Sequence, residues 1–232
     1  NDFSVLSSII PTDGSGFGPT DDGRIKPDIV VPSGAYTSSA SSNSAYSNSS
    51  GTSSSTAAVA GSVALIREHY QNLNADTLSS ASIRALLAHS ADDVGVEGPD
   101  YKMGWGLMNT ERAVRFLSAN HADNDRAVLK DTVLNSSNTI QINYEHTSTK
   151  PLIVTIAWTD PKGSVSVSGD DPEDIILVND LDMQVSDPNS TVFSPWVMDK
   201  NNPGNAATTG DNDVDNIEQI YISEHVSGEY TI

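Results

Sequence analysis

Residues 50–61, with the sequence SGTSSSTAAVAG, decide the fold of the first part of the chain. Thr52 is the expected N-cap, and the small residues after it predict a helix that runs to about Tyr70 and packs closely against a sheet. Ser53 then stands on the first helical turn, where a hydroxyl can meet a carbonyl carbon while free backbone N–H groups face the developing oxyanion. Such donors contribute about 3–4 kcal/mol each to transition-state stabilisation. On spacing alone, the simpler interpretation is a serine-rich loop that leads into a buried alanine helix.

Composition excludes several classes of protein. The 232 residues, 37% hydrophobic and 19% charged, fit one large domain or two modest ones. With 12 Lys and Arg against 31 Asp and Glu, the net charge of −19 argues against a nucleic-acid binder. No apolar run approaches the ~20 residues that span a bilayer, and the absence of Cys excludes disulfides, thiolate zinc sites and cysteine nucleophiles.

The composition and the first residues also bear on localisation. An acidic chain without Cys fits a secreted protein stabilised by calcium, and it equally fits a cytosolic one. The chain opens without a visible signal peptide, so we expect either that a leader was removed or that these residues come from the middle of a longer protein.

Periodicity predicts two domains, residues 1–120 and 121–232, with a polar boundary near residues 118–126. The first is predicted to be α/β, since a short apolar strand is followed by helical periods. Its expected elements are a strand at 25–31, a loop at 33–50, helices at 52–70, at 77–89 capped by Thr77, and from Thr110, and a tight turn at Gly104-Trp105-Gly106. The second is predicted to be an all-β jelly roll or sandwich, with strands near 140–144, 152–158, 175–185, 192–197, 217–222 and 230–232.

Three motifs resemble the subtilisin-like serine proteases, the subtilases. They are GTS at 51–53 with Thr56 and VAG at 59–61, the upstream segment GPTDDGRIKPDI at 18–29, and GWGLMN at 104–109 followed by Ala113. The resemblance implies a partial subtilisin-like, doubly wound α/β domain in which Ser53 is the nucleophile and its own N–H is an oxyanion donor. The sequence departs from the family at Ser54 and Ser55, which replace Met and Ala, and at Ala57 and Ala58, which replace Pro and His.

A serine nucleophile needs a base, and the family's catalytic Asp, His and oxyanion Asn all precede the segment where this chain begins. None of the five histidines, at 69, 89, 121, 146 and 225, stands in a family base motif. We therefore expect the C-terminal part of a protease, with the upstream half of its catalytic domain as a partner and no turnover by this part alone.

The second domain resembles the C-terminal β-barrel of some bacterial subtilases, in which calcium sites are common. The matching segments are WTDP at 158–161, LVNDLD at 177–182, DNIEQ at 215–219 and GEYT at 228–231. Asp199, Asp211, Asp213 and Asp215 are the candidate ligands of a structural Ca²⁺, a cation that takes 6–8 oxygens. A solvated acidic turn explains these residues equally well, while Asp180 and Asp182 are expected to form hydrogen bonds inside the sandwich.

These observations predict a secreted subtilisin-type serine endopeptidase that hydrolyses peptide bonds through an acyl-enzyme on Ser53. The alternative is a non-catalytic, calcium-stabilised binding or adhesion module on a protease-like scaffold, which the substitutions at 54, 55, 57 and 58 favour. No membrane or nucleic-acid partner is expected, and peptide specificity is not encoded in this part of the family pattern.

Overall fold

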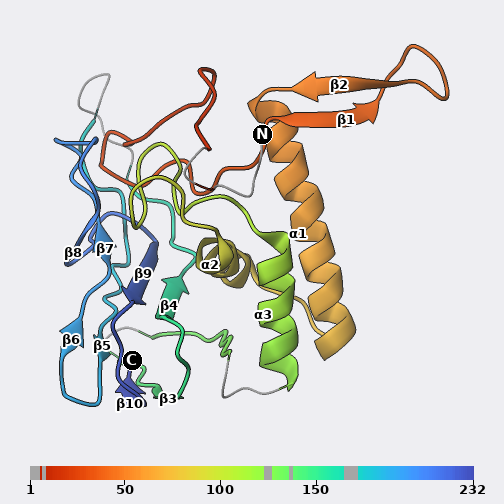
Figure 1. The fold of residues 1–232 in the computed structure, drawn as a ribbon. Coiled ribbons are helices and arrows are strands. Elements are labelled where there is room, and N and C mark those ends of the chain that lie inside the picture. Colours follow the sequence, from red (N-terminus) through yellow and green to blue (C-terminus); the bar gives the residue numbers. More distant parts are fainter. Residues whose placement is uncertain (1–5, 7–8, 123–126, 136–137, 165–171) are drawn as a thin grey trace.

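The helices and the strands of the C-terminal segment, β3 to β10, occupy opposite sides of the molecule, whereas strands β1 and β2 lie beside the helices (Figure 1). The computed structural model describes residues 6, 9–122, 127–135, 138–164 and 172–232. On one side stand the helices α1 (Thr52–Asn74), α2 (Ser80–Ser90) and α3 (Thr110–Ala122). Helix α3 packs between α1 and α2, and α2 faces the strands β4 (Leu152–Ala157) and β9 (Ile217–Ile222). The predicted boundary near residues 118–126 lies partly outside the described residues, and the division into two domains stays a prediction.

The second segment consists of short antiparallel strands. Strands β4 and β9 pair with each other from Leu152 opposite Ile222 to Ala157 opposite Ile217. A four-stranded sheet has the order β3-β10-β5-β6, and β7 pairs with β8. The bounds are β3 Asn143–His146, β5 Val185–Ser186, β6 Val192–Phe193, β7 Trp196–Val197, β8 Thr208–Thr209 and β10 Gly228–Thr231. An all-β segment is therefore present, whereas its jelly-roll topology stays a prediction.

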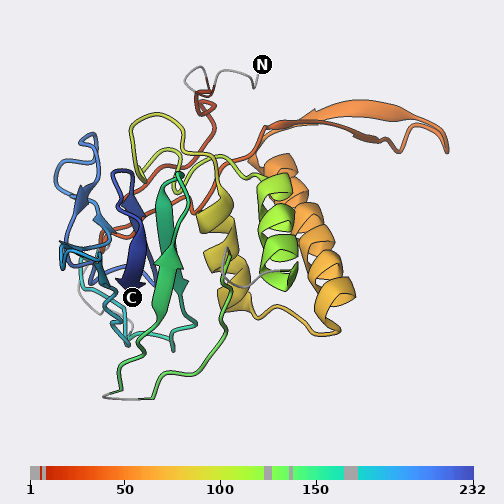
Figure 2. The same cartoon turned by 60° about the horizontal axis from the view of Figure 1, so that its bottom comes forward.

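A two-stranded hairpin projects from the start of α1 (Figures 1 and 2). It pairs β1 (Gly34–Ser38) with β2 (Tyr46–Ser50), so the prediction of a loop over 33–50 is wrong. Backbone pairing and the stacked rings of Tyr36 and Tyr46, whose centroids are 5.6 Å apart, hold the ribbon without a buried face. The strand predicted at 25–31 is reduced to a parallel bridge between Val30 and Leu107.

The helix starts differ from those predicted. Gly51, with φ 112°, is the N-cap of α1, and no side chain caps the helix, so Thr52 is already inside it. Ser79, rather than Thr77, caps α2, because its hydroxyl accepts the N–H of Ser82 at 3.0 Å. Only Ile66 is buried among the residues of α1, so the close packing of its small residues against a sheet is not observed within the described residues.

One of the three hydrophobic clusters formed by the described residues joins the two segments. It combines Ile25, Ala88, Tyr101 and Trp105 of the first segment with Ile217 of the second. The predicted turn around Trp105 is confirmed, since Gly104 and Gly106 have φ of 61° and 118° and the indole is buried. The other clusters lie among the helices and within the strands. The second segment is thus docked on the first through a shared apolar core.

Polar contacts reinforce this junction. The buried carboxylate of Asp215 accepts the N–H of Ile25 at 3.0 Å, and burial raises the pKa of Asp215 to about 6. Arg84 donates to Asn216 at 2.7 Å, and Gln219 donates to the carbonyl of Ala88 at 3.3 Å. Each of these hydrogen bonds joins a residue of the second segment to a residue of the first. Together with the apolar core, they fix the position of one segment against the other.

His89 of α2 contacts the second segment at this junction. Its Nδ1 lies 3.1 Å from Oγ1 of Thr155 in β4, and its ring packs edge-on against Phe116. Burial first, and the charge of Arg112 second, lower the pKa of His89 to about 4. The neutral imidazole is therefore the form that fits between α2 and β4.

We expect the junction to lose stability as the pH falls from about 6.5 to about 4, where the unfolded chain binds a proton on His89 and the folded chain does not. The full effect on the free energy of unfolding is about 3 kcal/mol. Comparing the pH dependence of urea unfolding for wild type and His89→Asn isolates this contribution, since other groups titrate in both proteins. Parallel profiles for the two proteins would contradict the role of His89.

Candidate active site

Ser53 lies on the first turn of α1, as predicted, and its side chain is exposed. The hairpin β1–β2 leads directly into this turn through Gly51, whose N–H donates to the carbonyl of Ser33 at 3.1 Å. The positive φ of Gly51 reverses the chain between strand and helix, a conformation that favours glycine. The local fold therefore presents the side chain of Ser53 at the N-terminal end of a long helix.

The three consecutive serines differ in how their hydroxyls are engaged. Ser54 Oγ lies 2.8 Å from Ser49 Oγ in the hairpin, and Ser55 Oγ donates to the carbonyls of Pro32 and Gly51, each at 3.4 Å. Within the described residues, the hydroxyl of Ser53 has no hydrogen-bond partner. Of the three, Ser53 thus has the hydroxyl that is free to react.

Backbone donors accompany this hydroxyl. Residues in the first turn of a helix have N–H groups without intrahelical acceptors, and the positive end of the helix dipole favours negative charge there. The N–H groups of Ser54 and Ser55 both donate to Gly51 O, at 3.0 and 3.2 Å. Among the described contacts, the N–H groups of Thr52 and Ser53 have no acceptor. These two donors are available to an oxyanion formed at Ser53.

No histidine in the described part of the chain contacts Ser53. His69 bonds to Ser118 at 2.8 Å, and His121 to Asn74 at 3.3 Å. His89 contacts Thr155, as described above, and His146 bonds to the carbonyl of Lys150 at 3.1 Å. His225 packs edge-on against His146. The general base that a serine nucleophile needs is therefore not among the described contacts of this chain.

One face of α1 next to Ser53 is uncovered. Ala57, Ala60, Gly61 and Ala64 are exposed, and they recur at spacings that place them on the same side of the helix as Ser53. Leu65 beside them is 60% exposed. Small exposed residues of this kind let another polypeptide backbone approach the helix closely.

The four predicted calcium ligands do not face one centre in the structure. Asp199 is exposed and accepts hydrogen bonds from Asn201 and Asn202, which lower its pKa. Asp215 is buried at the junction, and Asn212 donates to its second oxygen at 3.3 Å. Asp211 and Asp213 are exposed. Within the described residues, no three His, Asp or Glu side chains are placed to hold a metal ion, so these ligands stay a prediction.

A buried carboxylate that sequence reasoning missed lies nearby in β9. Glu218 is 0% exposed, its Oε2 accepts the N–H of Met183 at 2.9 Å, and its Oε1 has no partner among the described residues. Burial, together with the charges of Asp182, Asp180 and Asp211, raises the pKa of Glu218 to about 8 against the effect of the Met183 N–H. A charged residue inside the apolar alternation of 217–222 was the available signal.

Asp180 and Asp182, expected inside the sandwich, are instead exposed and accept no hydrogen bond from the described residues.

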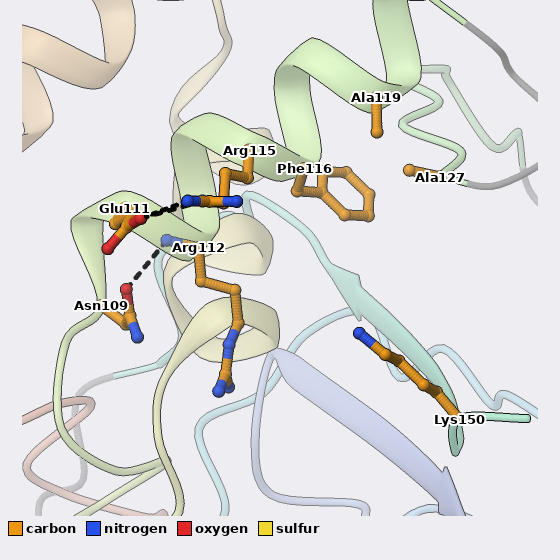
Figure 3. Close-up of a pocket in the computed structure, with 8 residues that line it drawn as sticks. All are labelled: Asn109, Glu111, Arg112, Arg115, Phe116, Ala119, Ala127 and Lys150. Atoms are coloured by element: carbon orange, nitrogen blue, oxygen red, sulfur yellow. Dashed lines mark hydrogen bonds and ion pairs between the residues drawn. The ribbon is translucent and has the colours of Figure 1, made fainter. Parts of the chain in front are cut away.

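A hollow of about 530 Å³ lies along α3 (Figure 3). Phe116, Ala119 and Ala127 form its apolar wall, and the Lys150 side chain extends across from them. Arg112 pairs with Asp92 and Arg115 with Glu111 in the same helix. Because Ser53 does not line this hollow, it is not the cleft of the nucleophile.

A comparison with protein families shows which class of protein the first segment is similar to. Residues 7–106 match the model of the Subtilase family, which confirms the resemblance over the stretch that includes Ser53 and the turn at Trp105. The α/β character predicted for the first segment agrees with this match. No helix in the described part of the chain has the length and apolar character to cross a membrane.

Two individual relatives extend the comparison. The chain is 26% identical over 270 aligned residues to "Serine protease/ABC transporter B family protein tagA" of Dictyostelium discoideum, with 99% of this chain and 14% of that protein covered. It is 37% identical over 60 residues to "Serotype-specific antigen 1" of Mannheimia haemolytica, with 26% of this chain and 6% of that protein covered. The chain therefore spans about a seventh of the first relative and a smaller share of the second.

Proposed function

We propose that this chain is the nucleophile-bearing part of a secreted, subtilisin-type serine endopeptidase. The observation that carries the proposal is the exposed hydroxyl of Ser53, without a hydrogen-bond partner among the described residues, beside the unpaired N–H groups of Thr52 and Ser53 at the start of α1. The Subtilase match over residues 7–106 supports the same residue.

In the proposed reaction, Ser53 Oγ attacks the carbonyl carbon of a peptide bond while a histidine base takes its proton. The N–H groups at the start of α1 stabilise the oxyanion of the tetrahedral intermediate. The carbon–nitrogen bond then breaks, the base protonates the leaving amine, and water hydrolyses the acyl-enzyme. We place the base and its Asp in the upstream half of the catalytic domain, outside these 232 residues.

Calcium is proposed as a structural cofactor of the second segment, which we take to be a jelly-roll domain. A hard cation would neutralise part of the net charge of −19 and would lie among oxygen ligands, as acidic side chains supply. The proposed ligands are those that the sequence predicts, Asp199, Asp211, Asp213 and Asp215. The ion would hold strands and loops in place, and it would take no part in the chemistry at Ser53.

A second candidate function is a non-catalytic binding module on the same scaffold. The observation that favours it is that no histidine in the described residues contacts Ser53. Under this function, the exposed face of α1 would hold a partner rather than the other half of an enzyme, and Ser53 would be an ordinary surface residue.

Labelling with a fluorophosphonate probe separates the two functions, because the probe reacts only with an activated serine hydroxyl. We expect the full-length protein to be labelled at Ser53, which peptide mass spectrometry identifies. Ser55→Ala is the matched control and keeps the label, whereas Ser53→Ala loses it. A wild-type protein that is folded but unlabelled would favour the binding module, and label retained in Ser53→Ala would overturn the assignment of the nucleophile.

A further inference from the structure

Two histidines far apart in the sequence bring their rings into contact beside the four-stranded sheet. His146 is the last residue of β3, and His225 lies in the turn between β9 and β10. The register of β3 with β10 sets His146 opposite Gly228, close to the end of this turn. The centroids of the two imidazole rings are 4.6 Å apart, and the ring planes meet at 89°. The fold therefore places two side chains that commonly bind metal ions next to each other.

Each of these rings has a buried nitrogen without a hydrogen bond. Nδ1 of His146 and Nδ1 of His225 are both buried, and neither has a partner among the described residues. The side chain of His146 is only 4% exposed. A buried polar atom costs free energy unless something binds it. Two such atoms on adjacent rings indicate a ligand that both of them can bind.

The tautomer of His146 is the one that a metal ligand requires. Its Nε2 lies 3.1 Å from the carbonyl oxygen of Lys150. Because a carbonyl oxygen can only accept, Nε2 carries the proton, and the lone pair of the neutral ring is on Nδ1. Burial first, and the neighbouring His225 second, lower the pKa of His146, so its ring is neutral at pH 7. Histidines that bind metals usually donate their other ring N–H in this way, which fixes the orientation of the ring.

Tyr230 holds both histidines in position. Its hydroxyl accepts the N–H of Val226 at 3.2 Å and donates to the carbonyl of Val226 at 3.0 Å, which fixes the turn that carries His225. Its buried ring packs edge-on against His146, with 5.8 Å between the centroids. His225 is itself partly exposed, so an ion can reach the pair from solvent.

We propose that Nδ1 of His146 and Nδ1 of His225 bind a single Zn²⁺ ion. Imidazole nitrogen is a preferred ligand of Zn²⁺, whereas Ca²⁺ takes oxygen ligands. Within the described residues, no third His, Asp or Glu joins the pair, so water completes the coordination of the ion. The ion would bind both buried nitrogens and would join β3 to the turn before β10. This site goes beyond the proposed protease function and does not depend on Ser53.

Zinc titration and histidine NMR test the site in the 232-residue chain, with millimolar Ca²⁺ present throughout to occupy oxygen sites. We expect Zn²⁺ to raise the melting temperature of wild type. In long-range ¹H–¹⁵N spectra, Zn²⁺ should shift the Nδ1 signals of His146 and His225. His225→Asn removes a ligand at a partly exposed position. It should weaken Zn²⁺ binding, measured by calorimetry, by at least the roughly tenfold that loss of an outer-shell partner costs.

His121→Asn is the matched control, because His121 is exposed and bonds to Asn74 in the helical part of the chain. It should bind Zn²⁺ as wild type does. Unchanged affinity in His225→Asn, a loss confined to His121→Asn, or Zn²⁺ binding that leaves the signals of His146 and His225 unmoved would overturn the proposal. The NMR shifts are measured on wild type, so they decide the matter even if His225→Asn fails to fold. Neither result bears on the labelling of Ser53, so the two experiments fail independently.

Discussion

If the full-length protein is the protease that we propose, replacing Ser53 by alanine is expected to lower kcat by about 10⁶-fold. The substitution removes the oxygen that forms the acyl-enzyme, whereas substrate binding, and with it KM, changes little. Steady-state hydrolysis of a peptide substrate, followed over a wide range of enzyme concentrations, measures the loss. Turnover near the wild-type value in Ser53→Ala would refute the assignment of the nucleophile.

Two controls separate a loss of chemistry from a loss of structure. The hydroxyl of Ser53 is exposed and bonds to no described residue, so Ser53→Ala should change the free energy of unfolding by less than about 0.5 kcal/mol. Ser55→Ala removes only two long hydrogen bonds, at 3.4 Å, on the same helical turn. It should retain most of the activity. A large loss in Ser55→Ala would indicate instead that the whole turn is sensitive to substitution.

Elements with strong apolar periodicity were predictable from the sequence. The alternation at 152–157 and 217–222 predicts two strands, and these pair with each other in full register. The helix at 110–122 follows from Ala113 and Leu117, both of which are buried. The hairpin at 34–50 was missed because its serine-rich strands bury nothing, and backbone pairing leaves no mark in the side-chain pattern.

The candidate sites were predictable to a smaller degree. The position of Ser53 on the first helical turn follows from the small residues after it, although Gly51 rather than Thr52 is the cap. The neighbours of Ser53 have hydroxyls that are already bonded: Ser54 contacts Ser49, and Ser55 donates to the carbonyl of Pro32. These contacts form where the chain reverses at Gly51, and they leave Ser53 as the serine with a free hydroxyl. The partner of Glu218 lies 35 residues away, and no local pattern predicts a contact over that distance.

Replacing Gly104 by alanine is expected to destabilise the chain by about 3 kcal/mol or more, which corresponds to a fall in Tm of roughly 6–12 °C. Gly104 has φ 61°, and an added Cβ would lie 2.0 Å from the carbonyl oxygen of Pro27 and 2.5 Å from that of Asp28. Both obstacles are backbone atoms, so relief requires the turn to move. Trp105, whose N–H donates to Asp28 O at 2.8 Å, would move with it.

The effect of this substitution should extend to the junction between the segments, because Trp105 packs in the same cluster as Ile217 of β9. Gly61→Ala is the matched control: a Cβ added there would have no described atom within 4 Å and the helical backbone is unstrained, so it should stabilise the chain by roughly 0.5–1 kcal/mol. Thermal unfolding followed by far-UV circular dichroism and tryptophan fluorescence measures both variants. If Gly104→Ala unfolds like wild type, the turn does not fix the position of Trp105 in the cluster that it shares with Ile217.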